Sequence, residues 1–164
     1  MDTSSKNLVP HLVSHEEQEF VLDNRLQQDC EWVLDFTLCR VLLMQDNHYP
    51  WFILVPRRRN VEEIYQLSDD DLALLMRESS HFGKGVMRLF SGDKLNVAAL
   101  GNVVSQLHVH HVVRYRDDAA WPAPVWGKQP TRPYSKTQLE ERIKLVREYF
   151  SEHFSEHISE YVPQ

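Results

Sequence analysis

The sequence is poor in the residues that build covalent or metal-stabilised scaffolds. Its 164 residues include two cysteines, Cys30 and Cys39, and five glycines. Two cysteines supply neither a disulfide framework nor a four-ligand zinc site. We therefore expect both thiols to be small, reduced core residues. A hydrophobic content of 42% is enough for the core of a single domain.

Positive charge and long apolar runs are also scarce. The chain has 18 Lys and Arg against 24 Asp and Glu, a formal charge of -6 and a pI near 5.8. This balance argues against a nucleic-acid surface built on positive charge. No run approaches the about 20 apolar residues of a membrane span, and the N-terminus lacks the apolar core of a signal peptide. We expect a cytoplasmic protein that binds neither nucleic acid nor membrane.

Hydrophobic patterning predicts an α+β fold, with a mostly antiparallel sheet and one long helix packed across it. The expected strands cover residues 30–44, 51–56, 94–102 and 103–115. The turn formers of residues 46–50 join the first two strands. Ser68, followed by three aspartates, caps the long helix, and Ser135 caps a C-terminal helix that ends near Phe154.

The chain is expected to form one unit with two parts. Residues 1–118 form the catalytic domain, in which residues 1–14 are loosely held, as termini often are. Residues 119–164 are a segment rich in proline and tryptophan followed by the C-terminal helix. Trp121 and Trp126 need a surface to bury them, which is either their own chain or a partner subunit.

The segment GNVVSQLHVHHVVR, residues 101–114, places three histidines within four residues. Side chains of a strand alternate between its faces, so two sets form. One face carries Gln106, His108 and His110, and the other carries Leu107, Val109 and His111. A polar row on a buried strand needs polar partners. His111, among apolar neighbours, is expected to be structural.

Three interpretations of His108 and His110 remain open. The pair is incidental, or it binds a metal, or one imidazole acts as a nucleophile. A metal site would need a third ligand, and the motif offers none on the same face. Gly101 and Asn102 precede the strand, where backbone N–H groups can approach an anion closely. This placement favours nucleophilic chemistry on a phosphate.

These residues resemble the signature of the histidine-triad (HIT) family of nucleotide hydrolases and transferases. Residues 101–104 match its lead-in, residues 106–112 match its triad, and Arg114 matches an arginine common just after it. The run GNVV-x-QLHxH resembles a bacterial branch of the family. The similarity in element order covers about residues 20–118. A second register, with Val112 as the third triad position, fits the lead-in and Arg114 less well.

The resemblance implies a mechanism without a cofactor. His108 would attack the α-phosphorus and form a nucleotidyl-histidine, with its Nδ1–H held by a backbone carbonyl. His110 and Gln106 would bind phosphate oxygens, and Asn102 with the amides beside Gly101 would hold the transition-state oxygens. Gln106 replaces the first histidine of the triad and cannot act as a titrating acid.

The resemblance also implies a nucleoside pocket and a homodimer. An acidic or amide residue at the end of an early strand would contact the ribose, and Asp46 is the candidate, although Asp46 suits a simple turn equally well. The tail from Trp121 onward would pack on or near the site of the partner subunit. Arg57–Arg59 could steer phosphates or form a solvated edge.

The function implied is hydrolysis or transfer at the α-phosphate of a nucleoside phosphoramidate, a dinucleoside polyphosphate or a similar conjugate. One alternative is a nucleotide-binding regulatory protein with little turnover, which the loss of the first histidine supports. A second alternative is a metal-dependent hydrolase that uses His108 and His110.

Overall fold

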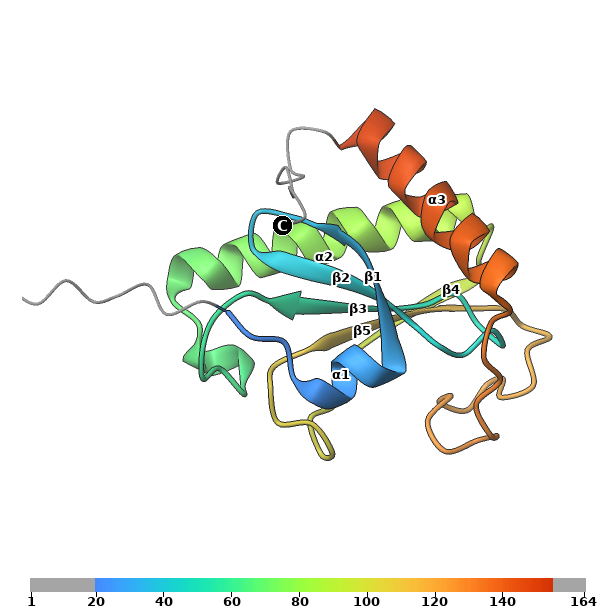
Figure 1. Cartoon of the computed structure of the whole chain (residues 1–164), viewed down its shortest axis with the longest axis horizontal. Coiled ribbons are helices and arrows are strands. Elements are labelled where there is room, and N and C mark those ends of the chain that lie inside the picture. Colours follow the sequence, from blue (N-terminus) through green and yellow to red (C-terminus); the bar gives the residue numbers. More distant parts are fainter. Residues whose placement is uncertain (1–19, 155–164) are drawn as a thin grey trace, which may run out of the picture.

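The computed structural model describes residues 20–154, and Figure 1 shows a single sheet flanked by helices. The segment expected to be loosely held, residues 1–14, lies outside the described residues. The strands are β1 (Cys30–Asp35), β2 (Cys39–Met44), β3 (Trp51–Pro56), β4 (Lys94–Ala99) and β5 (Val109–Arg114). The helices are α1 (Asn24–Asp29), the 3₁₀ turn η1 (Ile64–Gln66), α2 (Asp69–Leu89) and α3 (Lys136–His153).

The five strands form one antiparallel sheet in the order β1-β2-β3-β5-β4. The central strand β3 pairs with β2 on one side and with β5 on the other, and Ile53 lies opposite His110. The expected α+β class, with a long helix across a mostly antiparallel sheet, is confirmed. No helix within residues 20–154 is long and apolar enough to cross a membrane.

Each face of the sheet carries its own hydrophobic cluster. Alternate side chains of the strands, such as Phe52 and Leu54, pack with Phe82 of α2 and Phe150 of α3. The intervening side chains, such as Trp51 and Ile53, pack against α1, the β4–β5 loop and residues 120–126. Figure 1 accordingly shows α2 and α3 apart from α1. The second face is the one that holds the candidate site.

The two long helices begin where the sequence predicts. The Ser68 hydroxyl accepts a hydrogen bond from the backbone N–H of Asp71 at the start of α2. Ser135 and Gln138 form a capping box at the start of α3, which ends at His153 with Phe154 as its C-cap. The glycines of α2 permit close packing, because a Cβ at Gly85 would overlap the ring of Phe150.

The expected strand over residues 30–44 is wrong, because the chain reverses within it. Strands β1 and β2 form a hairpin in which Asp35 pairs with Arg40. The turn contains no Gly, Pro, Asn or Asp. Instead, the buried carboxylate of Glu78 in α2 accepts the backbone N–H groups of Leu38 and Cys39 at 2.7 and 2.8 Å. A tertiary contact therefore replaces the usual turn residues.

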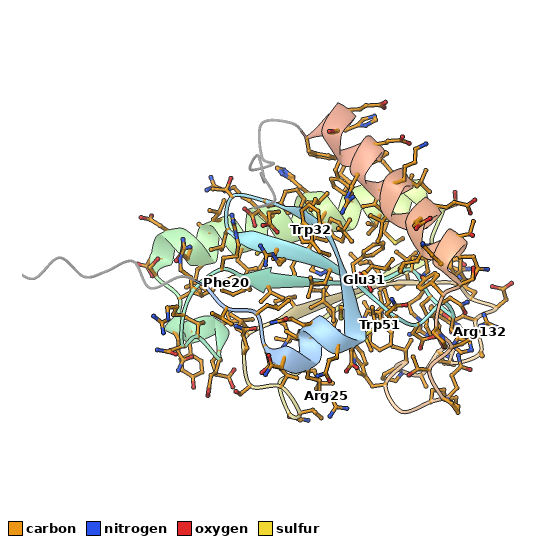
Figure 2. All side chains as sticks on the ribbon, in the orientation of Figure 1. Phe20, Arg25, Glu31, Trp32, Trp51 and Arg132 are labelled. Carbon is orange, nitrogen blue, oxygen red and sulfur yellow. The ribbon has the colours of Figure 1, made fainter. Side chains whose placement is uncertain are left out.

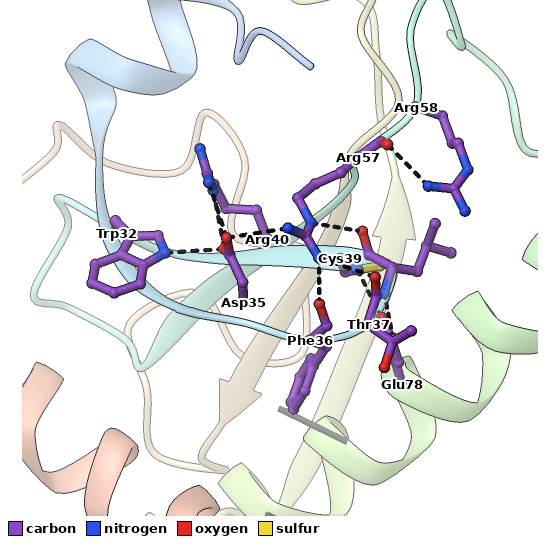
Figure 3. A network of polar contacts seen from close by, with 10 residues as sticks. Trp32, Asp35, Phe36, Thr37, Cys39, Arg40, Arg57, Arg58 and Glu78 are labelled. Carbon is purple, nitrogen blue, oxygen red and sulfur yellow. Dashed lines mark hydrogen bonds and ion pairs between the residues drawn. The ribbon is translucent and has the colours of Figure 1, made fainter. Parts of the chain in front are cut away.

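A second set of polar contacts surrounds the same turn (Figure 3). The Asp35 carboxylate accepts hydrogen bonds from the Trp32 indole and the Arg40 guanidinium. Arg57 donates to the carbonyls of Phe36 and Thr37. Arg57, the first arginine of the basic run, thus stabilises the hairpin. This role differs from the two that were expected for the run, which were phosphate steering and a solvated edge.

The expected strand over residues 103–115 is also too long. Strand β5 begins only at Val109, which pairs with Ala99, the last residue of β4. Before Val109 the chain pairs with neither β4 nor β3, and the N–H of Leu107 donates instead to the carbonyl of Val61. Gln106 and His108 therefore lie in the β4–β5 loop, residues 100–108.

Candidate active site

Two cavities meet at His108. The first, here called the polar cavity, has a volume of about 280 Å³ and lies between residues 62–63 and the β4–β5 loop. The second, here called the apolar cavity, has a volume of about 360 Å³ and lies among α1, β3, the same loop and Trp126. Leu100, Asn102 and His108 line both cavities. A ligand could therefore place one part in each cavity and its centre beside His108.

His108 is held with one ring nitrogen free. Its side chain is buried, with 5% of the residue exposed. Nδ1 lies 2.7 Å from the carbonyl oxygen of Gln106, and because a carbonyl only accepts, Nδ1 carries the proton. Nε2 has no hydrogen-bond partner among residues 20–154 and keeps its lone pair. The expected carbonyl contact is thus present, and the tautomer suits nucleophilic attack.

His110 is held in the opposite tautomer by a different contact. The Trp51 indole N–H donates to His110 Nδ1 at 2.9 Å, so the proton of the neutral ring lies on Nε2. Burial, with smaller contributions from His108 and His111, lowers the pKa of His110 from 6.5 to about 3. The indole opposes protonation too, because the cation would set two N–H groups against each other. His110 is therefore a neutral hydrogen-bond donor.

Two tryptophans enclose His110. Trp51 and Trp126 meet edge to face with ring centroids 5.6 Å apart, and Trp126 lies 5.3 Å from His110. Figure 2 shows Trp51 next to α1, with which it shares the apolar cavity. Trp126 is thus packed on its own chain. Trp51 was not among the predicted site residues, because only the register of β3 against β5 brings it to His110.

The Gln106 amide is engaged with the backbone of the segment before α1. Its Oε1 accepts the N–H of Asp23, and its Nε2 donates to the carbonyl of Val21, both at 2.9 Å. A side-chain amide matches a backbone in this way because it carries a donor and an acceptor side by side. Gln106 was expected to bind phosphate oxygens. With these two contacts made, only the second Nε2 hydrogen of its amide remains to donate to a phosphate.

Comparison with known proteins places this arrangement in a family. The HIT domain matches residues 25–117. This range includes the residues that line both cavities, Leu100, Asn102 and His108. The chain belongs to the HIT domain family.

Solved structures agree with this assignment. A histidine triad protein from Marinobacter aquaeolei VT8 is 48% identical, with 82% of this chain and 98% of that chain covered and a TM-score of 0.79. A histidine triad protein from Bradyrhizobium japonicum is 40% identical, with coverages of 80% and 98% and a TM-score of 0.78. The Plasmodium falciparum diadenosine triphosphate hydrolase, 16% identical over 86% and 90% at a TM-score of 0.55, shares the fold. No curated protein matches the chain.

The HIT lead-in residues lie where the two cavities join. Asn102 lines both cavities together with His108. Gly101 lines the polar cavity, and a Cβ there would stand 3.2 Å from the carbonyl oxygen of Val104, closer than side chains usually approach. Glycine therefore permits the tight bend that brings the loop backbone next to His108. The structure brings together Gly101, Asn102, His108 and His110.

Asp46 is not brought to this site. Its carboxylate accepts hydrogen bonds from the N–H and ring of His48 and from the N–H of Arg132, so it holds the β2–β3 turn to residue 132. Among residues 20–154, the carboxylate that lines the apolar cavity is Asp29, at the end of α1, which pairs with Arg25 at 3.3 Å. Neither α1 nor Asp29 at its end was predicted from the sequence.

The other titratable groups near the HIT motif are structural. His111 faces α2, where its Nε2 lies 2.8 Å from the Ser79 hydroxyl, and burial lowers its pKa to about 4. Cys30 and Cys39 are buried free thiols, as expected. Burial raises the pKa of Cys30 to about 12 and also raises that of Cys39. Across residues 20–154, no three His, Cys, Asp or Glu side chains cluster as metal ligands.

Arg114 joins the HIT strand to the segment that follows it. Its guanidinium, in a residue that is 1% exposed, makes two hydrogen bonds to Asp118 and one each to the side chain of Asn96 and the carbonyl of Ala123. The arginine thereby connects β4, β5 and residues 118–123, which lead to Trp126. It supports one wall of the apolar cavity without lining that cavity.

Proposed function

We propose that this HIT protein is a nucleotide hydrolase or nucleotidyl transferase that acts at the α-phosphate of a nucleotide conjugate through a nucleotidyl-His108 intermediate. The observation that carries the proposal is the state of His108. Its Nδ1–H is held by a carbonyl, while its Nε2 has no partner among residues 20–154 at the point where two cavities join. A buried imidazole with a free, oriented lone pair is suited to covalent catalysis.

The reaction has two displacements. The Nε2 lone pair of His108 forms a bond to phosphorus, and the bond from phosphorus to the leaving atom breaks with its electron pair on that atom. Water or an acceptor then attacks phosphorus, the Nε2–P bond breaks, and a nucleoside monophosphate or its ester is released. His110 donates from Nε2 to a phosphate oxygen, and Asn102 with the amides beside Gly101 holds the developing charge.

The apolar cavity is proposed to take the nucleoside. Trp51, Trp126 and Met44 offer apolar and aromatic surface for a base. We assign the ribose contact to Asp29 in place of Asp46, because the Asp29 carboxylate lines this cavity and Asp46 serves the turn. Gln106 acts mainly by fixing residues 21–23, and its amide offers no titrating proton to a leaving group.

We propose that the chain folds as a single unit. Two such chains are proposed to form a homodimer in the cytoplasm. Contacts of Arg114 and Trp126 with residues on both sides of position 118 support one unit. The edge strand β4 and the loop after it expose Val97, Leu100 and Val103, which supports association through this edge. Light scattering on the full chain should give twice the monomer mass of 19.4 kDa.

The test of the function is a trapping experiment with the full chain. A nucleoside phosphoramidate and a dinucleoside polyphosphate are each incubated with the protein, with and without EDTA, and the product and the protein mass are measured after a neutral quench. We expect nucleoside monophosphate and an acid-labile adduct on His108, both insensitive to EDTA. His108→Asn should give neither.

Two outcomes favour the alternatives. Tight nucleotide binding with neither product nor adduct would support the regulatory protein, for which the non-titrating Gln106 is the motivating observation. Turnover abolished by EDTA and restored by a divalent metal would support the metal-dependent hydrolase. Either result overturns the nucleotidyl-histidine mechanism.

A further inference from the structure

The polar cavity carries negative charge that has no role in the proposed reaction. Glu62 and Glu63 form its wall opposite the β4–β5 loop. Its other lining residues are neutral or histidine, and no Lys or Arg of residues 20–154 is among them. Neither carboxylate forms an ion pair with a described residue, and the nearby Arg58 is paired with Asp71 at 2.7 Å. The cavity is therefore negatively charged.

The acidic wall is fixed in place by its backbone. Gln66 Oε1 accepts the N–H groups of both Glu62 and Glu63, at 2.8 and 2.9 Å. One residue earlier, the carbonyl of Val61 accepts the N–H of Leu107 from the β4–β5 loop. The segment that carries the two carboxylates is thus tied to the loop that carries His108. The distance between acidic wall and candidate nucleophile is set by these contacts.

A second, independent observation at this cavity points to a ligand. His108 lines the cavity and is only 5% exposed. Its Nε2 has no hydrogen-bond partner in the described part of the chain. The same side chain also lines the proposed nucleoside cavity. A conjugate attacked at its α-phosphorus has two halves, so with the nucleoside on the apolar side, the leaving half has the polar cavity available.

We infer that the polar cavity is a leaving-group subsite in which Glu62 and Glu63 select a leaving half that carries positive charge. This inference rests on the proposed function. A polyphosphate leaving half would bring several negative charges to two carboxylates, and no Lys or Arg of residues 20–154 lines the cavity to offset them. An ammonium group would instead gain two partners. The substrate class is therefore a nucleoside monophosphate conjugate of a cationic amine, rather than a dinucleoside polyphosphate.

For an amine conjugate the reaction balances without a further reagent. His108 Nε2 forms its bond to phosphorus, the P–N bond breaks, and its electron pair and a proton from solvent go to the amine nitrogen. Water then displaces Nε2 from phosphorus and returns one proton to solvent. The remote ammonium group of the amine takes no part in bond breaking, so its charge affects selection alone.

The test compares three phosphoramidates of one nucleoside monophosphate, made from 1,4-diaminobutane, butylamine and γ-aminobutyrate. Their leaving chains have similar length and carry a positive charge, no charge and a negative charge. We expect kcat/KM to fall in that order, with the cationic conjugate roughly tenfold above the anionic one, since two exposed carboxylates act together. The ratio should shrink in high salt.

The double substitution Glu62→Gln with Glu63→Gln should bring this ratio to within about threefold of one. Asp70→Asn is the matched control, because it removes an exposed carboxylate that lines neither cavity and should preserve the ratio. Equal kcat/KM for cationic and anionic conjugates, or a preference that survives the double substitution, overturns the subsite.

Failure of the proposed function can be told apart from failure of the subsite. The affinities of the three conjugates are also measured by calorimetry on His108→Asn, which should bind without turnover. If the wild-type protein cleaves neither these conjugates nor a dinucleoside polyphosphate, the proposed function fails. The affinity order, and its loss in the triple variant that adds the two glutamine substitutions, then still decides whether the acidic wall selects positive charge.

Discussion

The β1–β2 turn and the β4–β5 loop each surround a buried polar side chain. The two side chains differ in how many of their hydrogen-bonding atoms have a partner. Glu78 is 4% exposed and both of its oxygens accept backbone N–H groups of the turn. His108 is 5% exposed, and only one of its two nitrogens has a partner in residues 20–154. Burial of a polar group thus does not by itself mark a functional site. We propose His108 as the reacting group because its second nitrogen has no partner in the described residues and lies where two cavities join.

The sharpest test of this contrast is His108→Asn. Loss of the nucleophile should lower kcat on the order of 10⁴-fold, whereas the free energy of unfolding should change by only about 1 kcal/mol, because a single carbonyl contact is lost. Steady-state kinetics and urea unfolding measure the two effects. Residual turnover within tenfold of wild type would contradict the assignment of His108.

The converse is expected for Glu78→Gln. The new NH₂ group would face a backbone N–H of the turn and leave it unsatisfied, which should cost about 3 kcal/mol of the free energy of unfolding. kcat/KM, measured well below the melting temperature, should stay within about twofold. Glu140→Gln on the exposed face of α3 is the matched control and should change stability by less than about 0.5 kcal/mol. Equal stability of both variants would refute the role of Glu78.

A third prediction concerns how stability depends on pH through the two buried histidines on opposite faces of β5, His110 and His111. The pKa values of His110 and His111 are lowered to about 3 and about 4, so the unfolded chain binds protons below pH 6.5 that the folded chain does not. Stability should therefore fall as pH falls from 6.5 toward 4, by up to about 1.4 kcal/mol per pH unit for each ring.

His111→Asn should remove the share of one ring from this slope, in urea unfolding series between pH 6 and 4.5. His153→Asn, at an exposed position, is the matched control for removing a histidine. An unchanged slope in His111→Asn would show that His111 does not titrate as its burial implies.

The smallest expected effect concerns the two tryptophans around His110. Trp51→Phe removes the N–H that fixes the His110 tautomer, and we expect kcat to fall about tenfold, the value of one neutral hydrogen bond. The pKa of His110, followed by NMR, should rise. Trp126→Phe is the matched control, because the Trp126 N–H has no partner in the described part of the chain. Identical His110 tautomers in both variants would contradict the positioning role of Trp51.

The sequence predicts the parts of the fold that local signals encode. Ser68 and Ser135 mark the starts of α2 and α3, and the turn formers at 46–50 mark the reversal between β2 and β3. The β1–β2 turn escapes prediction because its stabilising group, Glu78, lies about 40 residues away in the chain. The start of β5 escapes it because strand length depends on where β4 ends.

The same division applies to the site. The motif identifies His108, His110, Gly101 and Asn102, because their spacing within one segment is visible in the sequence. Trp51 reaches His110 only through the register of β3 with β5, which the sequence does not reveal. The segment with Glu62 and Glu63 reaches the motif through a backbone contact between residues 61 and 107.

The position of Arg114 has a consequence for how proteins of this kind diverge. One guanidinium ties the end of β5 to residues 118–123, and those residues set where Trp126 stands over His110. A substitution at Arg114, Asp118 or Asn96 would move an aromatic wall while every ligand-contacting side chain kept its identity. Under the proposed function, base preference can therefore drift through positions that a comparison of pocket residues alone would score as unchanged.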